Sequence, residues 1–228
     1  MAAGIDTVIF VTGLNKRAIE DHFDANYELE DSLRSKGKDK DANMVRNILP
    51  EGIECIFVRQ PIQRGLGDAV LCAERIVGNE PFAVLLADDF LTDYQPGATA
   101  DLIDAYSVNG KMQLSVMQVD GPEISKYGVV APGSLEWDVA GLIEKPKLQN
   151  APSNLASIGP YVLTPDIFET LRSLPIGSGG EVQLADAINV RAKVGDVQLV
   201  RLNGERFDYG LVAGYIDAIN FQFNDNFK

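Results

Sequence analysis

The sequence predicts an α/β fold: a Rossmann-like, mostly parallel sheet flanked by helices, followed by a mixed C-terminal half. Apolar runs of strand length alternate with longer segments of helical periodicity through the first half of the chain. These short runs are apolar at nearly every position, which is typical of parallel strands covered by helices on both faces. Beyond Val119 the strand candidates follow one another without helices between them.

The first half carries the regular alternation. Residues 82–87, FAVLLA, form an uninterrupted apolar run, and residues 66–77 place their apolar side chains at helical spacing. By the same reasoning, strands are expected at 7–11, 53–58, 82–87 and 112–119, and helices at about 16–33, 66–77 and 98–108. This order favours a parallel sheet covered by helices.

The second half is more irregular. Its strand candidates, separated by Pro and Gly, are YGVVAP (127–132), DVAGLIEKP (138–146) and LASIGPYVL (155–163). Two helices, a strand and a final helix are then expected at 165–174, 181–194, 197–202 and 212–223. Because no repeat, linker or low-complexity segment interrupts the chain, we expect a single domain over residues 1–228.

Composition excludes several classes of protein. A chain of 228 residues with 46% hydrophobic content is long enough to bury one sizeable core. The formal net charge is −13, and acids interleave with the basic residues of RSKGKDKD (34–41), so we expect a solvated face and no nucleic-acid partner. No run approaches the roughly 18 apolar residues of a membrane span, and the N-terminus lacks the basic region of a signal peptide.

Cysteine and histidine are scarce. Cys55 and Cys72 lie in apolar contexts without paired-motif spacing, so we expect reduced core thiols, which suit a cytoplasmic protein. His22 is the one histidine and lies in the polar stretch EDHFDANYE. We therefore expect neither a histidine metal site nor a Ser-His triad.

Acidic residues follow two expected strands. Asp88 and Asp89 come directly after residues 82–87, at a carboxyl end where open α/β sheets bind ligands. Successive strand residues point to opposite faces, so one of the pair is expected to face the ligand and to suit Mg²⁺ beside a phosphate. Asp208 follows residues 197–202 after a turn. Asp208 could be a second metal ligand or a residue that caps the following helix. A capping role is likewise the alternative for Asp88 and Asp89.

Two further stretches carry polar groups suited to ligands. In GLIEKP (141–146), Glu144 suits sugar hydroxyls and Lys145 suits a phosphate, whereas the alternative is an ordinary charged strand end. Strand geometry would turn these two side chains in different directions, so no ion pair between them is expected. In RQPIQRGLGDAV (59–70), glycines before a helix allow close approach of an anionic or polar ligand, and Gln60 offers both a donor and an acceptor.

Taken together and in order, eight stretches resemble bacterial UTP–glucose-1-phosphate uridylyltransferases, within the sugar nucleotidyltransferase superfamily. They are VTGLNKRAIEDHFD, RQPIQRGLGDAVLCA, PFAVLLADD, KYGVV, IEKPK, GPYVLTPDIF, GGEVQLADAI and ERFDYGLVAGY. The resemblance covers nearly the whole chain. It implies the nucleotide-diphospho-sugar transferase fold.

The resemblance also implies a reaction and its residues. UTP and glucose 1-phosphate would give UDP-glucose and pyrophosphate with Mg²⁺, mainly through positioning and charge neutralisation. The metal ligands would be Asp88 and Asp208, the uracil contacts Gln60 and Gly65, the glucose contacts Gly128, Glu144, Gly159 and Glu181, and the phosphate ligand Lys145. Relatives self-associate, so the resemblance leaves a homo-oligomer open.

The sequence departs from the family at its start. The family opens with a first strand and a glycine-rich loop of the form GxGTR…PK, whereas this chain begins at MAAGIDTVIFV, the family's second strand, and ends at FQFNDNFK. We therefore expect truncation at the N-terminus and at the C-terminus, with a missing strand between 7–11 and 82–87. Asp68 stands where members of the family have a His, and Pro160 stands where many of them have an Arg. Losing phosphate-binding donors predicts impaired turnover, since one such donor is worth about 3–4 kcal/mol.

Two alternatives remain beside this reading. A glycosyltransferase that uses nucleotide sugars would also place acids at a strand end. A non-catalytic sugar-nucleotide-binding or regulatory subunit would keep the uracil and glucose contacts without turnover.

Overall fold

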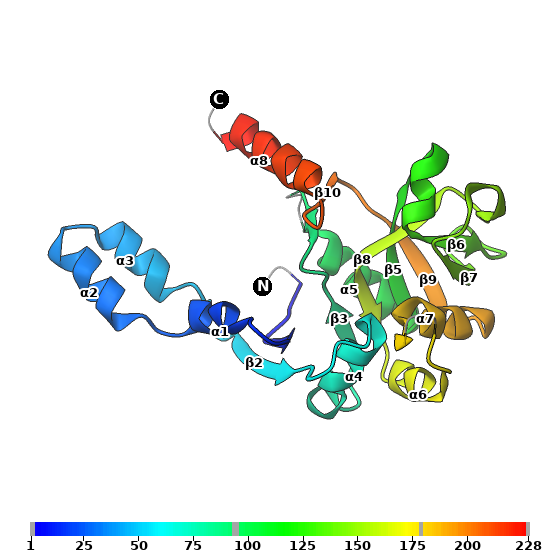
Figure 1. The fold of residues 1–228 in the computed structure, drawn as a ribbon, viewed down its shortest axis with the longest axis horizontal. Helices are drawn as coiled ribbons and strands as arrows, with labels where there is room; N and C mark the ends of the chain where they lie inside the picture. The colour runs from blue at the N-terminus through cyan, green and yellow to red at the C-terminus, as the bar shows by residue number, and fades with distance from the viewer. Residues whose placement is uncertain (1–2, 93–95, 178–179, 227–228) are drawn as a thin grey trace. The chain divides into compact units, whose positions relative to one another are not determined.

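The computed structural model describes residues 3–92, 96–177 and 180–226. Its contacts divide the chain into two compact units, one of Ala3–Gln63 and a larger one that starts at Arg64. Figure 1 shows the elements of both units, coloured along the chain from blue to red. The expectation of one domain over 1–228 stays a prediction.

The smaller unit is built on two parallel strands. Its elements are β1 (Thr7–Thr12), α1 (Arg17–Phe23), α2 (Tyr27–Ser35), α3 (Asp39–Arg46) and β2 (Glu54–Arg59). β1 pairs in parallel with β2, and Phe10 stacks on Phe57 with ring centroids 5.2 Å apart. Phe10 also contacts Phe23 at 4.8 Å, so aromatic packing holds α1 against the strand pair.

The helices of this unit differ from expectation. The single helix expected at about 16–33 is wrong, because the chain forms α1 and α2 with a break between them. Asn26 explains the break: its side-chain oxygen accepts the backbone N–H of Leu29 at 3.0 Å and caps a new helix. α3 was not expected, although it begins within the polar segment 34–41 and Ala42 is the residue it buries.

The larger unit contains a six-stranded mixed sheet. The strands of the whole unit are β3 (Phe82–Val84), β4 (Asp89–Leu91), β5 (Met112–Gln118), β6 (Gly128–Pro132), β7 (Val139–Glu144), β8 (Leu155–Leu163), β9 (Val197–Arg201) and β10 (Arg206–Asp208). The main sheet has the order β7-β6-β8-β5-β9, and β3 also pairs with β8. β4 and β10 form a separate antiparallel pair.

The α/β class is confirmed, but the main sheet is mixed and its described pairings are mostly antiparallel, not mostly parallel as expected. β3, β5, β6 and β9 run in one direction, but β8 lies between them and pairs antiparallel with β3, β5 and β6. The parallel ladder in this sheet joins β5 to β9. β8 takes the central place because it is buried at every position and mostly apolar, with Ser157 as its buried polar residue. Among the described residues, no strand pairing joins β1 and β2 to this sheet.

The helices of the larger unit are α4 (Leu66–Val77), α5 (Ala98–Asn109), α6 (Asp166–Ser173), α7 (Leu184–Lys193) and α8 (Val212–Asn226), with short 3-10 turns η1 (Gly121–Lys126) and η2 (Leu148–Asn150). The helices α4 to α7 cover the main sheet as expected, whereas α8 packs on β10. Side chains of α4, α6 and α7 join those of the strands in the main core, where Phe168 stacks on Phe82 at 5.1 Å. α5 packs on β5 and β8. The main core is therefore a sheet covered by a layer of helices.

The strand expected at 82–87 ends early. β3 stops at Val84, Leu85 is 64% exposed, and Asp89 N donates to Leu86 O at 3.2 Å in a turn. The apolar run is therefore half strand and half turn, and β4 begins where the acids were expected to follow the strand.

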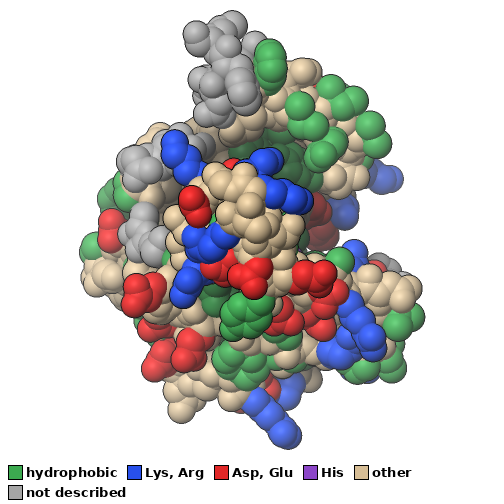
Figure 2. All heavy atoms as spheres, turned by 90° about the vertical axis from the view of Figure 1, so that its left-hand side faces the viewer, with side chains coloured by type: hydrophobic (Ala, Val, Ile, Leu, Met, Phe, Trp, Pro, Cys, Tyr) green, Lys and Arg blue, Asp and Glu red, His purple; other side chains and the backbone are tan. Residues whose placement is uncertain are grey.

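The surface is mixed in charge. Figure 2 shows Asp and Glu side chains interleaved with Lys and Arg on the face that it presents. Within the described ranges, none of the helices combines the length and the apolar character that crossing a membrane requires.

Gly67, in the first turn of α4, leaves no room for a side chain. A Cβ there would lie 2.7 Å from Val182 O and 2.8 Å from Leu171 Cδ2. We expect Gly67→Ala to lower the free energy of unfolding by about 1–2 kcal/mol, because overpacking outweighs the helix propensity that Ala gains. Urea unfolding measures the change.

The control is Gly13→Ala, whose Cβ would lie 3.5 Å from Gln63 Nε2, an ordinary contact. A Gly67→Ala variant as stable as the wild type would contradict the close packing of α4.

Candidate active site

A cavity of about 330 Å³ opens in the larger unit. Residues from the turn after β3, the η1–β6 junction, the end of β7, β8, the start of α7 and β10 surround it. Its charged lining consists of the carboxylates of Asp88, Asp89, Glu144 and Asp208 and the cations of Lys126, Lys145 and Arg206. Six residues that the sequence singled out line it, namely Asp88, Asp89, Gly128, Glu144, Lys145 and Asp208.

Asp88 and Asp208 converge at the edge of this cavity. β4 pairs with β10 so that Asp208 lies opposite Asp89, and Tyr209 N donates to Asp88 O at 2.7 Å. A Cβ on Gly210 would lie 3.0 Å from Asp208 Oδ1 and 3.5 Å from Asp88 Oδ2, so both carboxylates border the same point. Asp208 also accepts the Gly210 N–H at 2.9 Å, which shows that its turn role and its approach to Asp88 coexist.

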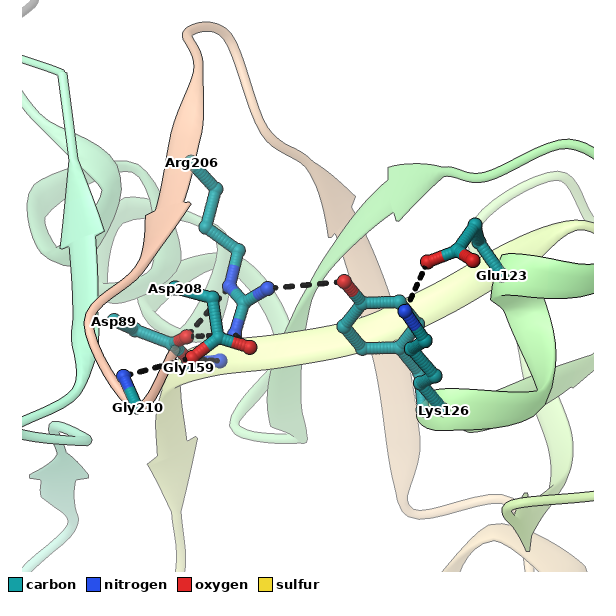
Figure 3. A network of polar contacts seen from close by, with 8 residues as sticks. Asp89, Glu123, Lys126, Gly159, Arg206, Asp208 and Gly210 are labelled. Atoms are coloured by element: carbon teal, nitrogen blue, oxygen red, sulfur yellow. Dashed lines mark hydrogen bonds and ion pairs between the residues drawn. The ribbon is translucent and has the colours of Figure 1, made fainter. Parts of the chain in front are cut away.

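Asp89 faces a different partner. Both Nε and Nη2 of Arg206 donate to Asp89 Oδ1, and Gly159 N–H donates to Asp89 Oδ2 at 3.1 Å (Figure 3). The two side chains are buried, with 4% of Asp89 and 9% of Arg206 exposed. One acid of the pair therefore has a structural ion pair, and the other reaches toward Asp208.

The ion pair shifts the pKa of both partners. Burial raises the pKa of Asp89, while the charge and hydrogen bonds of Arg206 and the Gly159 N–H oppose that shift. Burial acts to lower the pKa of Arg206, but the Asp89 carboxylate contributes most to a net increase. The guanidinium thus stays charged in its buried position.

Glu144 and Lys145 correct an expectation. Lys145 Nζ lies 3.5 Å from Glu144 Oε1, although strand alternation predicted that the two side chains would diverge. The reason is that β7 ends at Glu144, and Lys145 has a left-handed backbone with φ of 44°. Both line the cavity, and Gly128 lies opposite Glu144, where a Cβ would be 3.1 Å from Glu144 Oε2.

The remaining glucose-site candidates lie close by. Gly159 contacts Asp89 through its N–H, and a Cβ there would lie 3.0 Å from Leu86 Cγ. Glu181 accepts a hydrogen bond from Gln183 Nε2 at 2.6 Å. Of the described residues, Gln183 rather than Glu181 lines the cavity.

The two uracil-site candidates belong to different units. Gln60 follows β2 in the smaller unit, where its backbone N–H donates to Thr12 O at 2.8 Å. Gly65 precedes α4 in the larger unit with φ of 89°, and a Cβ there would lie 2.9 Å from Val182 O and 3.1 Å from Glu181 Cβ. Gly65 is therefore required for packing against the segment that carries Glu181.

Three cavity residues were missed from the sequence. Arg206 precedes Asp208 by two residues in ERFD, the spacing that puts both on one face of a strand, and this spacing is the signal that could have revealed it. Lys126 pairs with Glu123, and Tyr127 accepts a hydrogen bond from Arg206 Nη1 at 3.2 Å. Nothing in KYGVV predicted the last two contacts.

Asp68, which stands where the family has a His, has a cationic partner. Its Oδ1 lies 3.0 Å from Arg64 Nη2. Asp68 is buried on the first turn of α4, so this ion pair compensates its charge within the larger unit.

The donor set suits a hard divalent cation. Among the described residues, no group of three or more His, Cys, Asp or Glu side chains could hold a metal ion. Magnesium needs fewer protein ligands than this, because it takes one or two carboxylates and completes its shell with water and substrate phosphate. Asp88 and Asp208 beside Gly210 provide such a pair.

Comparison with known proteins shows the family of this chain. A family model described as nucleotidyl transferase matches residues 1–224. The chain belongs to the nucleotidyl transferase family. It is 40% identical over 232 residues to UTP–glucose-1-phosphate uridylyltransferase of Pseudomonas aeruginosa, covering 99% of this chain and 82% of that protein. It is 43% identical over 217 residues to UTP–glucose-1-phosphate uridylyltransferase 2 of Staphylococcus saprophyticus, covering 94% and 74%.

Solved structures of nucleotidyl transferases have the same fold. An apo UDP-glucose pyrophosphorylase superposes with a TM-score of 0.92 at 39% identity, covering 99% of this chain and 84% of that one. A UDP-glucose pyrophosphorylase in complex with UDP-glucose gives 0.87 at 38% identity and the same coverage. A UTP-bound UGPase from Acinetobacter baumannii gives 0.91 at 36%, covering 100% and 80%. The family resemblance noted in the sequence is confirmed.

The Asp89–Arg206 ion pair yields a stability prediction. We expect Arg206→Met to lower the free energy of unfolding by about 3–5 kcal/mol, because it leaves a buried carboxylate without its partner. Urea unfolding followed by circular dichroism measures the change.

The matched control is Arg201→Met, which removes an exposed arginine 4.0 Å from Glu136 and should cost less than about 1 kcal/mol. Equal losses in the two variants would argue against a structural role for the buried pair.

Proposed function

We propose that this chain transfers a uridylyl group from UTP to glucose 1-phosphate, giving UDP-glucose and pyrophosphate. The observation that carries the proposal is the convergence of Asp88 and Asp208 on the cavity that Lys145 also lines. The relatives named UTP–glucose-1-phosphate uridylyltransferase, at 40% and 43% identity, support the choice of substrates.

The proposed reaction is a single in-line displacement. An oxygen of the glucose 1-phosphate attacks the α-phosphorus of UTP, and the bond from that phosphorus to the oxygen shared with the β-phosphorus breaks. Pyrophosphate leaves with the electron pair, so no covalent intermediate with the protein is needed. The work of the protein is to position the two phosphates and to neutralise their charge.

Asp88 and Asp208 fit the role of metal ligands. A chain of net charge −13 whose cavity has four carboxylates and three cations repels a triphosphate unless a further cation is bound. We propose Mg²⁺ as that cation, and its chemistry when bound would be neutralisation of charge on the transferring phosphate.

Lys145 and the glycines fit the sugar phosphate. Lys145 presents an ammonium point charge, suited to the phosphate of the sugar. Glu144 beside it can accept hydrogen bonds from sugar hydroxyls, and Gly128 leaves open the space next to that carboxylate. Following the resemblance, Gly159 and Glu181 complete the proposed glucose site of the larger unit, and Gly65 of the same unit contacts the uracil.

A direct assay tests the proposal. Incubation of the purified chain with UTP, glucose 1-phosphate and Mg²⁺ should release pyrophosphate and form UDP-glucose in equal amounts, and chelation by EDTA should stop both. The expectation of weak turnover remains a prediction that the same assay measures. Binding of UDP-glucose in calorimetry without any turnover would replace the proposal with a non-catalytic sugar-nucleotide-binding subunit.

Both free cysteines, Cys55 and Cys72, support a cytoplasmic location.

The carboxylate pair yields a further prediction. We expect Asp208→Asn and Asp88→Asn each to lower kcat by about 10²–10³-fold, as loss of one charge-stabilising group does elsewhere. Each should also weaken Mn²⁺ binding measured by electron paramagnetic resonance in the absence of substrates. The control is Asp217→Asn, an exposed acid on α8. Normal Mn²⁺ affinity in both site variants would refute the assignment of the metal ligands.

A further inference from the structure

We propose that Arg206 and Tyr127 are positioning residues that form one connection across the cavity and fix the carboxylate pair relative to Lys145. The inference rests on the proposed function, because it concerns the geometry between the two phosphate-binding halves of that site. Both side chains line the cavity, and the role inferred for them is to hold the metal ligands and Lys145 in place.

The carboxylate half of the cavity is not part of the main sheet. Asp208 belongs to β10, which pairs over three residues with β4 and with no other strand of the described chain. A ladder this short is weakly held by its own hydrogen bonds. Side-chain contacts, such as that of Asp89 with the Gly159 N–H of β8, therefore help to fix its position relative to the main sheet.

Lys145, on the other side of the cavity lining, also lies outside the strands of the main sheet. Lys145 lies one residue beyond the end of β7, with the left-handed backbone that turns it out of the strand. Its backbone N–H donates to Tyr127 O at 3.0 Å, which anchors it to the residue just before β6. Tyr127 is in turn held at the end of η1, because its own N–H donates to Ile124 O at 3.2 Å.

Arg206 joins the two halves. On one side it holds Asp89 through two donors and lies 3.7 Å from Asp208 Oδ2. On the other side, Nη1 donates to Tyr127 Oη at 3.2 Å, and Cζ lies 5.3 Å from the centroid of the Tyr127 ring. Figure 3 shows the guanidinium of Arg206 beside the carboxylates of Asp89 and Asp208.

The contacts thus run from the carboxylate pair through Arg206 and Tyr127 to Lys145. Each link has defined geometry, because the guanidinium fork is planar and rigid and the tyrosine ring has few rotamers. In-line transfer requires the reacting atoms to approach within about 3–3.5 Å, and a misplacement of about 1 Å can lower the rate about 10²-fold. A connection that fixes the carboxylate pair relative to Lys145 keeps the reacting atoms at this distance.

Tyr127→Phe tests the proposal, because it keeps the ring against Arg206 and removes the hydroxyl that accepts the hydrogen bond. We expect kcat to fall about 10-fold while the KM values for UTP and glucose 1-phosphate stay within about twofold, since each half still binds its own ligand. The Tm and the Kd for Mn²⁺ should match the wild type. A kcat loss that came together with lower Tm or weaker Mn²⁺ binding would indicate a merely structural role and overturn the inference, as would an unchanged kcat.

A second measurement does not depend on turnover. With Mn²⁺ bound, the ³¹P relaxation rate of glucose 1-phosphate reports the distance between the metal and the sugar phosphate. We expect a smaller relaxation enhancement in Tyr127→Phe than in the wild type at equal occupancy of both ligands. Identical enhancements would overturn the inference even if kcat had changed.

Matched variants complete the design. Tyr27→Phe removes a hydroxyl from a tyrosine that is 74% exposed and should leave every quantity unchanged. Arg206→Lys combined with Tyr127→Phe should lower kcat no further than the more damaging single change, because both interrupt one connection. A wild-type chain that makes no UDP-glucose would refute the proposed function itself, whereas a variant that behaves as the wild type refutes this inference alone.

Discussion

The ion pair between Asp89 and Arg206 is the interaction on which the rest of the site depends. It buries two charges that would be costly alone, and the cost is offset because each charge has several partners. Asp89 accepts from Arg206 and from the Gly159 N–H of β8, while Arg206 also reaches Tyr127. Through these bonds the short β4–β10 pair is tied to the central strand of the main sheet.

This arrangement divides four carboxylates into different roles. Asp89 is neutralised by Arg206, and Glu144 lies beside Lys145, so Asp88 and Asp208 are the two acids that converge at Gly210. Tyr161 adds no charge to the cavity at neutral pH, since the ordinary pKa of a tyrosine is about 10. Burial raises the pKa of Tyr161 further, to about 12. The cavity therefore combines two converging carboxylates with the ammonium groups of Lys126 and Lys145, a combination that suits the cation and the phosphates of the proposed reaction.

Close packing explains the glycines of the site as well as ligand binding does. At Gly128 and Gly210 an added Cβ would approach a site carboxylate to 3.1 Å and 3.0 Å. At Gly65 it would meet the backbone of Val182 instead. The same residue type therefore keeps space open beside the acids and lets α4 approach its neighbour. A motif that contains glycine alone does not distinguish these two uses.

The sequence by itself determined the α/β class, most helices, the strands of the second half and the family, because these depend on apolar periodicity and on ordered local motifs. It placed Asp88, Glu144, Lys145 and Asp208 at element ends, where ligand groups gather. Only the tertiary structure decided that β8 takes the centre of the sheet, that β3 ends at Val84 and that Lys145 turns toward Glu144. Arg206 and Tyr127 meet across 79 residues of sequence, and no local pattern records such a contact. Pairing between distant segments depends on which side chains become buried together in the folded chain. Local sequence patterns carry no information about that burial.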